Sequence, residues 1–163
     1  MNITKYLIVV VLSFLITGCA IKKEPIIKKY TKIDKYQFVV IPTTDSISSS
    51  SGGIYGNQYG IYGSSESKKL NPSSVIEGLL LKKGFTSISK TTSNIIDKTL
   101  IVKYGESGRR DVAGGLGGYT LEVTIKFISA KTQEPVFMCT AEGQGETEVD
   151  DIRDAITRCL SGL

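Results

Sequence analysis

An alternating segment in the second half of the chain does most to restrict the fold. In residues 120–127 every second side chain is apolar and those between are polar, with Leu121, Val123, Ile125 and Phe127 on one side. Because successive side chains of a strand point to opposite faces, this pattern predicts a strand with one buried and one solvated face. Residues 130–134 predict a turn and 135–141 a returning strand, so the two strands form a β-hairpin.

Two helices are predicted from capping residues and apolar stripes. The first begins at Asn71 and Pro72, ends at Gly84, and carries a stripe made of Val75, Ile76, Leu79 and Leu80. The second begins at Thr147 and carries a stripe made of Val149, Ile152, Ile156 and Cys159. We expect the stripe of the first helix to face the core, with a partner site as the alternative.

Shorter β-branched or apolar runs at 36–41, 85–89 and 99–104 predict the remaining strands. The resulting order is strand, helix, four strands, helix. We expect a single α+β domain over residues 36–163, with an antiparallel or mixed sheet of about four to five strands and two helices on one face. A chain of 163 residues has room for one such domain.

A Gly-, Ser- and Tyr-rich insert interrupts this domain at about residues 43–69. It repeats Gly-Ile-Tyr-Gly at 53–56 and 60–63. A connection of this length is usually a functional loop or a mobile insert. On the first interpretation, Tyr55, Tyr59 and Tyr62 supply large contact surfaces on a flexible backbone and form a candidate partner-binding loop.

A second glycine-rich connection spans residues 105–119 and contains Arg109 and Arg110. Its glycines lack the spacing of a dinucleotide- or phosphate-binding loop, and a strand follows where such a loop needs a helix. We expect the two arginines on a solvated hairpin tip, with an anion clamp as the alternative.

The first 19 residues predict an export signal. Lys5 precedes a largely apolar run at 6–16, which as a helix would span about 16 Å, roughly half of a hydrocarbon core. The ending Leu15-Ile16-Thr17-Gly18-Cys19 resembles the lipobox of bacterial lipoproteins. The resemblance implies a lipoprotein signal peptide at 1–18, cleavage between Gly18 and Cys19, diacylglycerol on the Cys19 thiol and acylation of the new amine.

These acyl chains would anchor the protein to membrane lipid. The residue after the cysteine is Ala20 and not Asp, which in a Gram-negative cell favours the outer membrane, with the protein facing the periplasm. No second membrane element is needed, because each buried CH₂ contributes about 0.8 kcal/mol.

Residues 19–35 are expected to form a basic tether after the lipidated cysteine. Pro25 interrupts any helix and the lysines repel one another, so the segment should extend into solvent or lie against anionic headgroups. Seven of the 20 basic residues but two of the 16 acidic residues precede Tyr36, which leaves 13 basic and 14 acidic residues in the domain. A near-neutral domain argues against nucleic-acid binding.

Two further cysteines, Cys139 and Cys159, follow in the domain. In an oxidising envelope compartment an even pair predicts a disulfide, with two free buried thiols as the alternative. The stripe of the second helix puts Cys159 on its buried face, within reach of a strand that carries Cys139. The chain has no His, so we expect no metal site, and no motif predicts a cofactor.

The residues do not predict an enzyme. Without His, a Ser-His-Asp triad and a Cys-His dyad are excluded. Ser65-x-x-Lys68 and Ser87-x-x-Lys90 match one element of the penicillin-recognising enzymes, but the other elements are missing. The acidic run from Glu142 to Asp154 predicts the solvated start of a helix rather than a cation site.

The predicted elements resemble a known group. They are similar to small envelope lipoproteins related to the penicillin-binding-protein activator lipoproteins and the N-terminal domain of TolB. The elements that carry the resemblance are the helix at 71–84, the strand at 100–104, the strand at 120–127 with its continuation through Lys131-Thr132 into 135–137, and the closing helix. The insert at 43–69 departs from the pattern of that group, so the resemblance does not identify a partner. The lipid anchor, the extended tether, the missing catalytic residues and the aromatic loop together predict an accessory or regulatory factor that binds a protein partner in the bacterial envelope. A carrier or sensor of a small ligand is the alternative, and a hydrolase is less favoured.

Overall fold

The structure is a computed structural model that describes residues 22–43, 47–57, 60–112 and 118–163. For residues 48–57 and 60–68 it describes the backbone alone. Among the described residues, no helix has the length and apolar character needed to span a membrane.

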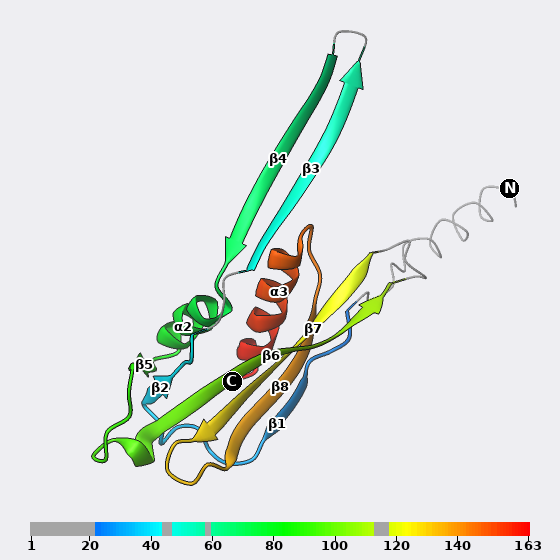
Figure 1. Ribbon diagram of the computed structural model, residues 1–163. Coiled ribbons are helices and arrows are strands. Elements are labelled where there is room, and N and C mark those ends of the chain that lie inside the picture. The colour runs from blue at the N-terminus through cyan, green and yellow to red at the C-terminus, as the bar shows by residue number, and fades with distance from the viewer. Residues whose placement is uncertain (1–21, 44–46, 58–59, 113–117) are drawn as a thin grey trace, which may run out of the picture.

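A six-stranded sheet forms the centre of the fold (Figure 1). Across the sheet the strands are β1 (Ile26–Lys29), β8 (Pro135–Gly143), β7 (Tyr119–Ser129), β6 (Thr99–Asp111), β2 (Phe38–Val40) and β5 (Thr86–Ser87). The pairs β1–β8, β8–β7 and β7–β6 are antiparallel, whereas β2 is parallel to β6 and β5. The sheet is therefore mixed and the fold is α+β, as predicted, with six strands where four to five were expected.

The predicted hairpin is present in this sheet as the neighbouring strands β7 and β8. Its alternating residues Leu121, Val123, Ile125 and Phe127 are fully buried. Phe127 lies opposite Phe137, and their ring centroids are 5.3 Å apart. The period-two pattern thus identified the buried face correctly.

Two helices cover that face. α2 (Pro72–Lys82) begins at Asn71, whose side chain accepts a hydrogen bond from the Ser73 amide, and α3 (Glu148–Ser161) begins at Thr147. The helix α3 packs on β7 and β8, and α2 packs against α3. Gly84 follows α2 with φ of 90°, a left-handed conformation that glycine adopts without a steric cost.

A disulfide joins the sheet to α3. Cys139 of β8 and Cys159 of α3 are bonded, with their Cα atoms 5.5 Å apart, and both residues are fully buried. The predicted pairing is confirmed, and the alternative of two free thiols is wrong for this structure.

The segment expected as a tether differs from that expectation. Residues 26–29 pair with residues 137–140 as the edge strand β1, and the Tyr30 and Thr31 amides both donate to the Val136 carbonyl. The side chains of this strand are exposed, so its attachment rests on the backbone ladder. Hence residues 22–35 belong to the folded domain and do not extend freely from it.

The insert at 43–69 contains a second, two-stranded sheet. Strands β3 (Ile47–Asn57) and β4 (Gly60–Leu70) pair antiparallel from Ile47 opposite Leu70 to Asn57 opposite Gly60. Figure 1 shows this hairpin projecting from the end of the domain where β8 ends and α3 begins. The sequence indicated a loop here, and the structure has a long hairpin.

The second glycine-rich connection is also shorter than expected. Strand β6 continues through Gly105 and Gly108 to Asp111, with a register shift between Glu106 and Gly108. Arg109 and Arg110 therefore lie within a strand and not on a solvated tip.

A 3-10 turn at Ile96–Lys98 precedes β6.

Candidate binding site

A hollow opens beside the connection between β1 and β2, and we call it the basic hollow. It consists of two adjoining depressions of about 430 and 630 Å³ that share Lys29, Ile33, Asp34 and Leu163. Lining residues come from the end of β1 and the connection at 30–37, from the start of β8, from the residues that follow α2, and from Leu163, which lies two residues after α3. Four separate segments of the chain thus form its walls.

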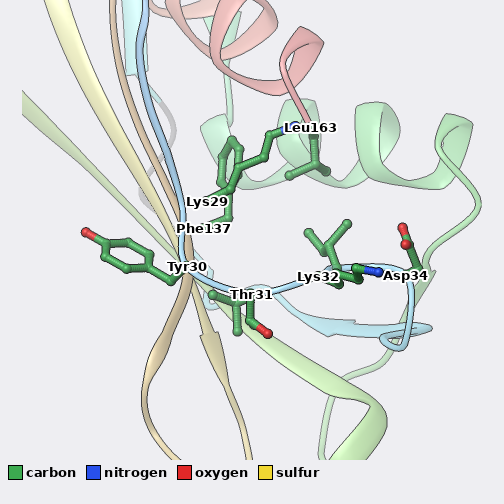
Figure 2. Close-up of a pocket in the computed structure, with 9 residues that line it drawn as sticks. Lys29, Tyr30, Thr31, Lys32, Asp34, Phe137 and Leu163 are labelled. Carbon is green, nitrogen blue, oxygen red and sulfur yellow. The ribbon is translucent and has the colours of Figure 1, made fainter.

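Apolar side chains make the floor of the basic hollow. Val136 and Phe137 of β8 are almost fully buried, and Tyr36 is 6% exposed. Ile33, Phe85 and Leu163 are partly buried and pack against the same core. Figure 2 shows Phe137 and Leu163 on the same side of β1, whereas Tyr30 points to the opposite side.

Charged side chains make the rim. Lys29, Lys32 and Lys83 are exposed and line the hollow together with one exposed carboxylate, Asp34. Lys83 Nζ lies 3.5 Å from the Leu163 carbonyl oxygen and donates to it. The lining side chains thus carry three ammonium groups against one carboxylate, so the rim attracts anions.

Backbone hydrogen bonds hold the walls in place. The Tyr36 amide donates to the Ile33 carbonyl at 2.9 Å, and the Gln37 amide donates to the Lys98 carbonyl at 2.9 Å. The Phe85 amide donates to the Leu80 carbonyl at 3.1 Å. A wall that is bonded in this way is preformed, so a ligand need not order it on binding.

At the other end of β1 lies a cluster of ion pairs around Glu142. The carboxylate accepts two hydrogen bonds from Arg110, at 2.9 and 2.6 Å, and one from the Lys23 amide at 2.9 Å. The Glu142 side chain is only 5% exposed. The Arg110 hydrogen bonds, with smaller contributions from Lys23, overcome the effect of burial and lower the pKa of Glu142 to about 2.

The same cluster holds the start of the described chain. Lys22 Nζ lies 2.7 Å from the Asp154 carboxylate of α3. Arg158 of α3 donates to the carbonyls of Lys23 and Glu142. We call these contacts the N-terminal clamp, since they fix residues 22 and 23 against β8 and α3.

These contacts correct the interpretation of the acidic run at 142–154. Glu142 lies in β8 and is buried, and Asp151 of α3 is 3% exposed, so part of the run is not solvated. Burial raises the pKa of Asp151, although its carboxylate accepts a hydrogen bond from the Gly145 amide. No group of three or more Cys, Asp or Glu side chains in the described part of the chain is arranged to hold a metal ion.

The residues that the sequence singled out do not meet at one site. Gly18, Cys19 and Tyr59 lie outside the described residues. Tyr55 and Tyr62 are opposite each other in the hairpin register, at positions where the backbone alone is described. The described residues that line the basic hollow come from other parts of the chain.

Sequence reasoning missed the basic hollow. Its lysines were assigned to a tether and to a helix end, and only the pairing of β1 with β8 brings them together. One signal was the cluster of apolar residues between the lysines of 26–35, which a solvated linker does not need.

Comparisons with models of protein families, with curated proteins and with solved structures find no match to this chain. The resemblance to the penicillin-binding-protein activator lipoproteins and to TolB therefore stays a prediction from the sequence.

Proposed function

We propose that this protein is a lipid-anchored, non-catalytic accessory factor of the bacterial envelope and that it binds a protein partner in the basic hollow. The observation that carries the proposal is an apolar floor whose partly exposed side chains are Ile33, Phe85 and Leu163, inside a rim of three lysines. The anchor is the acylated Cys19 implied by the lipobox.

The chemistry of the hollow favours one kind of partner segment. Its apolar floor releases water when an apolar side chain covers it, and its ammonium rim attracts carboxylates. A segment with one or two large apolar side chains flanked by Asp or Glu satisfies both requirements. We expect the lysines to increase the rate of association and the floor to supply most of the affinity.

A carrier or sensor of a small ligand is the second candidate. The volumes of the two depressions, about 430 and 630 Å³, fall within the range of small-molecule sites. Such sites enclose most of their ligand, however, whereas the rim here consists of exposed side chains. A broad, open surface of this kind suits a protein segment better.

The test is cross-linking in intact cells with the mature, lipidated protein as bait. In one variant, Lys32→Glu with Lys83→Glu reverses two charges of the rim. The matched control, Lys103→Glu with Lys126→Glu, reverses two exposed lysines that lie opposite each other on β6 and β7. The two variants have the same net charge.

We expect one dominant envelope protein with the wild type and the control, and at least about tenfold less of it with the rim variant. Equal recovery with both variants would contradict binding at the hollow. A bound small molecule in native mass spectra, without any protein partner, would favour the second candidate.

The partner contact expected of Tyr55, Tyr59 and Tyr62 also stays a prediction. A variant that lacks residues 48–65 tests it in the same assay. Loss of the partner with this variant, but not with the rim variant, would assign the contact to the hairpin.

A further inference from the structure

The N-terminal clamp fixes the chain close to the expected acyl anchor. Lys22 bonds to Asp154, and the Lys23 backbone bonds to both Glu142 and Arg158. From there β1 runs along β8 toward the basic hollow. The domain is thus held from residue 22 onward, and no long tether separates it from Cys19.

The distance that this leaves is short. Three peptide units join Cys19 to Lys22, and a fully extended chain covers at most about 11 Å over them. An acylated Cys19 lies at the membrane surface, so Lys22 and the residues that hold it must lie within about that distance of the headgroups. The end of the domain with the clamp therefore faces the bilayer.

The β3–β4 hairpin projects from this same end. Its strands contact α3, and Figure 1 shows it leaving the domain near the start of α3, where β8 ends. Each strand has 11 residues, which at about 3.4 Å per residue gives a length of about 35 Å. A projection of this length at the membrane-facing end must meet the lipid surface unless it bends away.

The composition of the hairpin fits that surface. Residues 46–65 include no Asp, Glu, Lys or Arg, and they contain Ile54, Tyr55, Ile61 and Tyr62. Tyr is enriched where membranes meet water, because its ring is apolar and its hydroxyl is polar. A two-stranded hairpin without further support is marginally stable in water, so this element needs a surface to lie on.

We propose that the β3–β4 hairpin lies in the headgroup region of the membrane that anchors the protein, so that the basic hollow faces away from the bilayer. This inference rests on the lipid anchor of the proposed function. It competes with the protein contact expected of the hairpin tyrosines, and one experiment separates the two.

The experiment uses single tryptophans as reporters, since the chain contains no Trp. The mature, lipidated protein is reconstituted into vesicles of phosphatidylcholine and phosphatidylglycerol, with or without brominated acyl chains, which quench nearby tryptophan. Tyr62→Trp reports on the hairpin, and Tyr55→Trp, opposite it in register, is the second hairpin reporter. Tyr30→Trp is the control, because Tyr30 is 52% exposed at the end of the domain with the hollow.

We expect brominated lipid to reduce the tryptophan emission of the two hairpin variants by about half or more, and to leave that of the Tyr30→Trp control unchanged. Hairpin emission that is no more quenched than that of the control, in protein that floats with the vesicles, would overturn the hairpin inference alone. Protein that does not float with vesicles would refute the acyl anchor, and the hairpin inference with it. If the hairpin variants are quenched but the cross-linking experiment recovers no partner, this inference stands and the proposed function is contradicted.

Discussion

Removing the charge of Glu142 should lower stability in a way that depends on pH. The substitution Glu142→Gln keeps the shape of the side chain but weakens its bonds to Arg110 and to the Lys23 amide. The Arg110 guanidinium and the Lys23 amide then face a neutral amide where the wild type has a buried carboxylate. We therefore expect the variant to be less stable than the wild type at pH 7.

The magnitude follows from the pKa of Glu142. A folded-state pKa of about 2 against the ordinary 4.5 corresponds to about 3 kcal/mol at pH 7. The Arg110 side chain is 38% exposed, so solvent screening reduces the expected value to about 2 kcal/mol. Because the folded state binds the proton less readily than the unfolded state, this stability is present above about pH 4.5 and is lost as the pH falls toward about 2.

The assay is urea unfolding followed by circular dichroism from pH 7 to pH 2. The wild type should be about 2 kcal/mol more stable than Glu142→Gln at pH 7, and the two should converge near pH 2. Glu134→Gln, which removes an exposed carboxylate in the β7–β8 turn, is the control and should differ little from the wild type. A constant difference between wild type and Glu142→Gln across this range would refute the reasoning.

Two further predictions concern packing. Replacing both Cys139 and Cys159 by Ala removes a disulfide that spans a sequence separation of 20, and it should lower the free energy of unfolding by about 3 kcal/mol. Urea unfolding without reductant measures this loss. An unchanged unfolding midpoint would contradict the stabilising role of the disulfide. Gly143→Ala should destabilise by about 1–3 kcal/mol, because a Cβ there would lie 1.8 Å from the Asp151 carbonyl oxygen, and thermal unfolding measures this. Gly105→Ala, where a Cβ meets nothing within 4 Å, is its control and should have a much smaller effect; an equal loss in both would show that contact with Asp151 is not the cause.

The elements that local patterns specify were predicted well. The alternation at 120–127 and the capped stripes at 71–84 and 147–159 each describe one buried face, and burial of that face determines the element. The pairing of Cys139 with Cys159 followed from the same reasoning, since a stripe residue must face the sheet. Strand number was underestimated because β1 has no buried side chain to reveal it.

The features that rest on long-range backbone contacts could not be predicted. β1 is held by hydrogen bonds to β8, more than 100 residues away, and its lysines suggested a solvated linker. The run of Ser and Gly at 48–53 has no period-two pattern, so the sequence did not indicate β3. Local composition cannot reveal a strand whose partner supplies only backbone hydrogen bonds.

The candidate site depended on those contacts. The basic hollow exists because β1 carries Lys29 past Phe137 and the following connection reaches the end of α2. The sequence groups Glu142 with the acidic residues that follow it and so predicts a solvated side chain. Its partners, Arg110 and Lys23, are 32 and 119 residues away. Charge pairs at such separations cannot be found from spacing along the chain.

The acyl anchor proposed at Cys19 can be tested directly in the membrane fraction of cells that produce the protein. Intact-mass and N-terminal peptide spectra should show a mature chain that begins at Cys19 and carries the mass of diacylglycerol and an amide-linked acyl chain. The Cys19→Ala protein should lack these groups and leave the membrane fraction. A mature chain that begins elsewhere, or an unmodified Cys19, would contradict a lipid-anchored domain held at the bilayer by its N-terminal clamp.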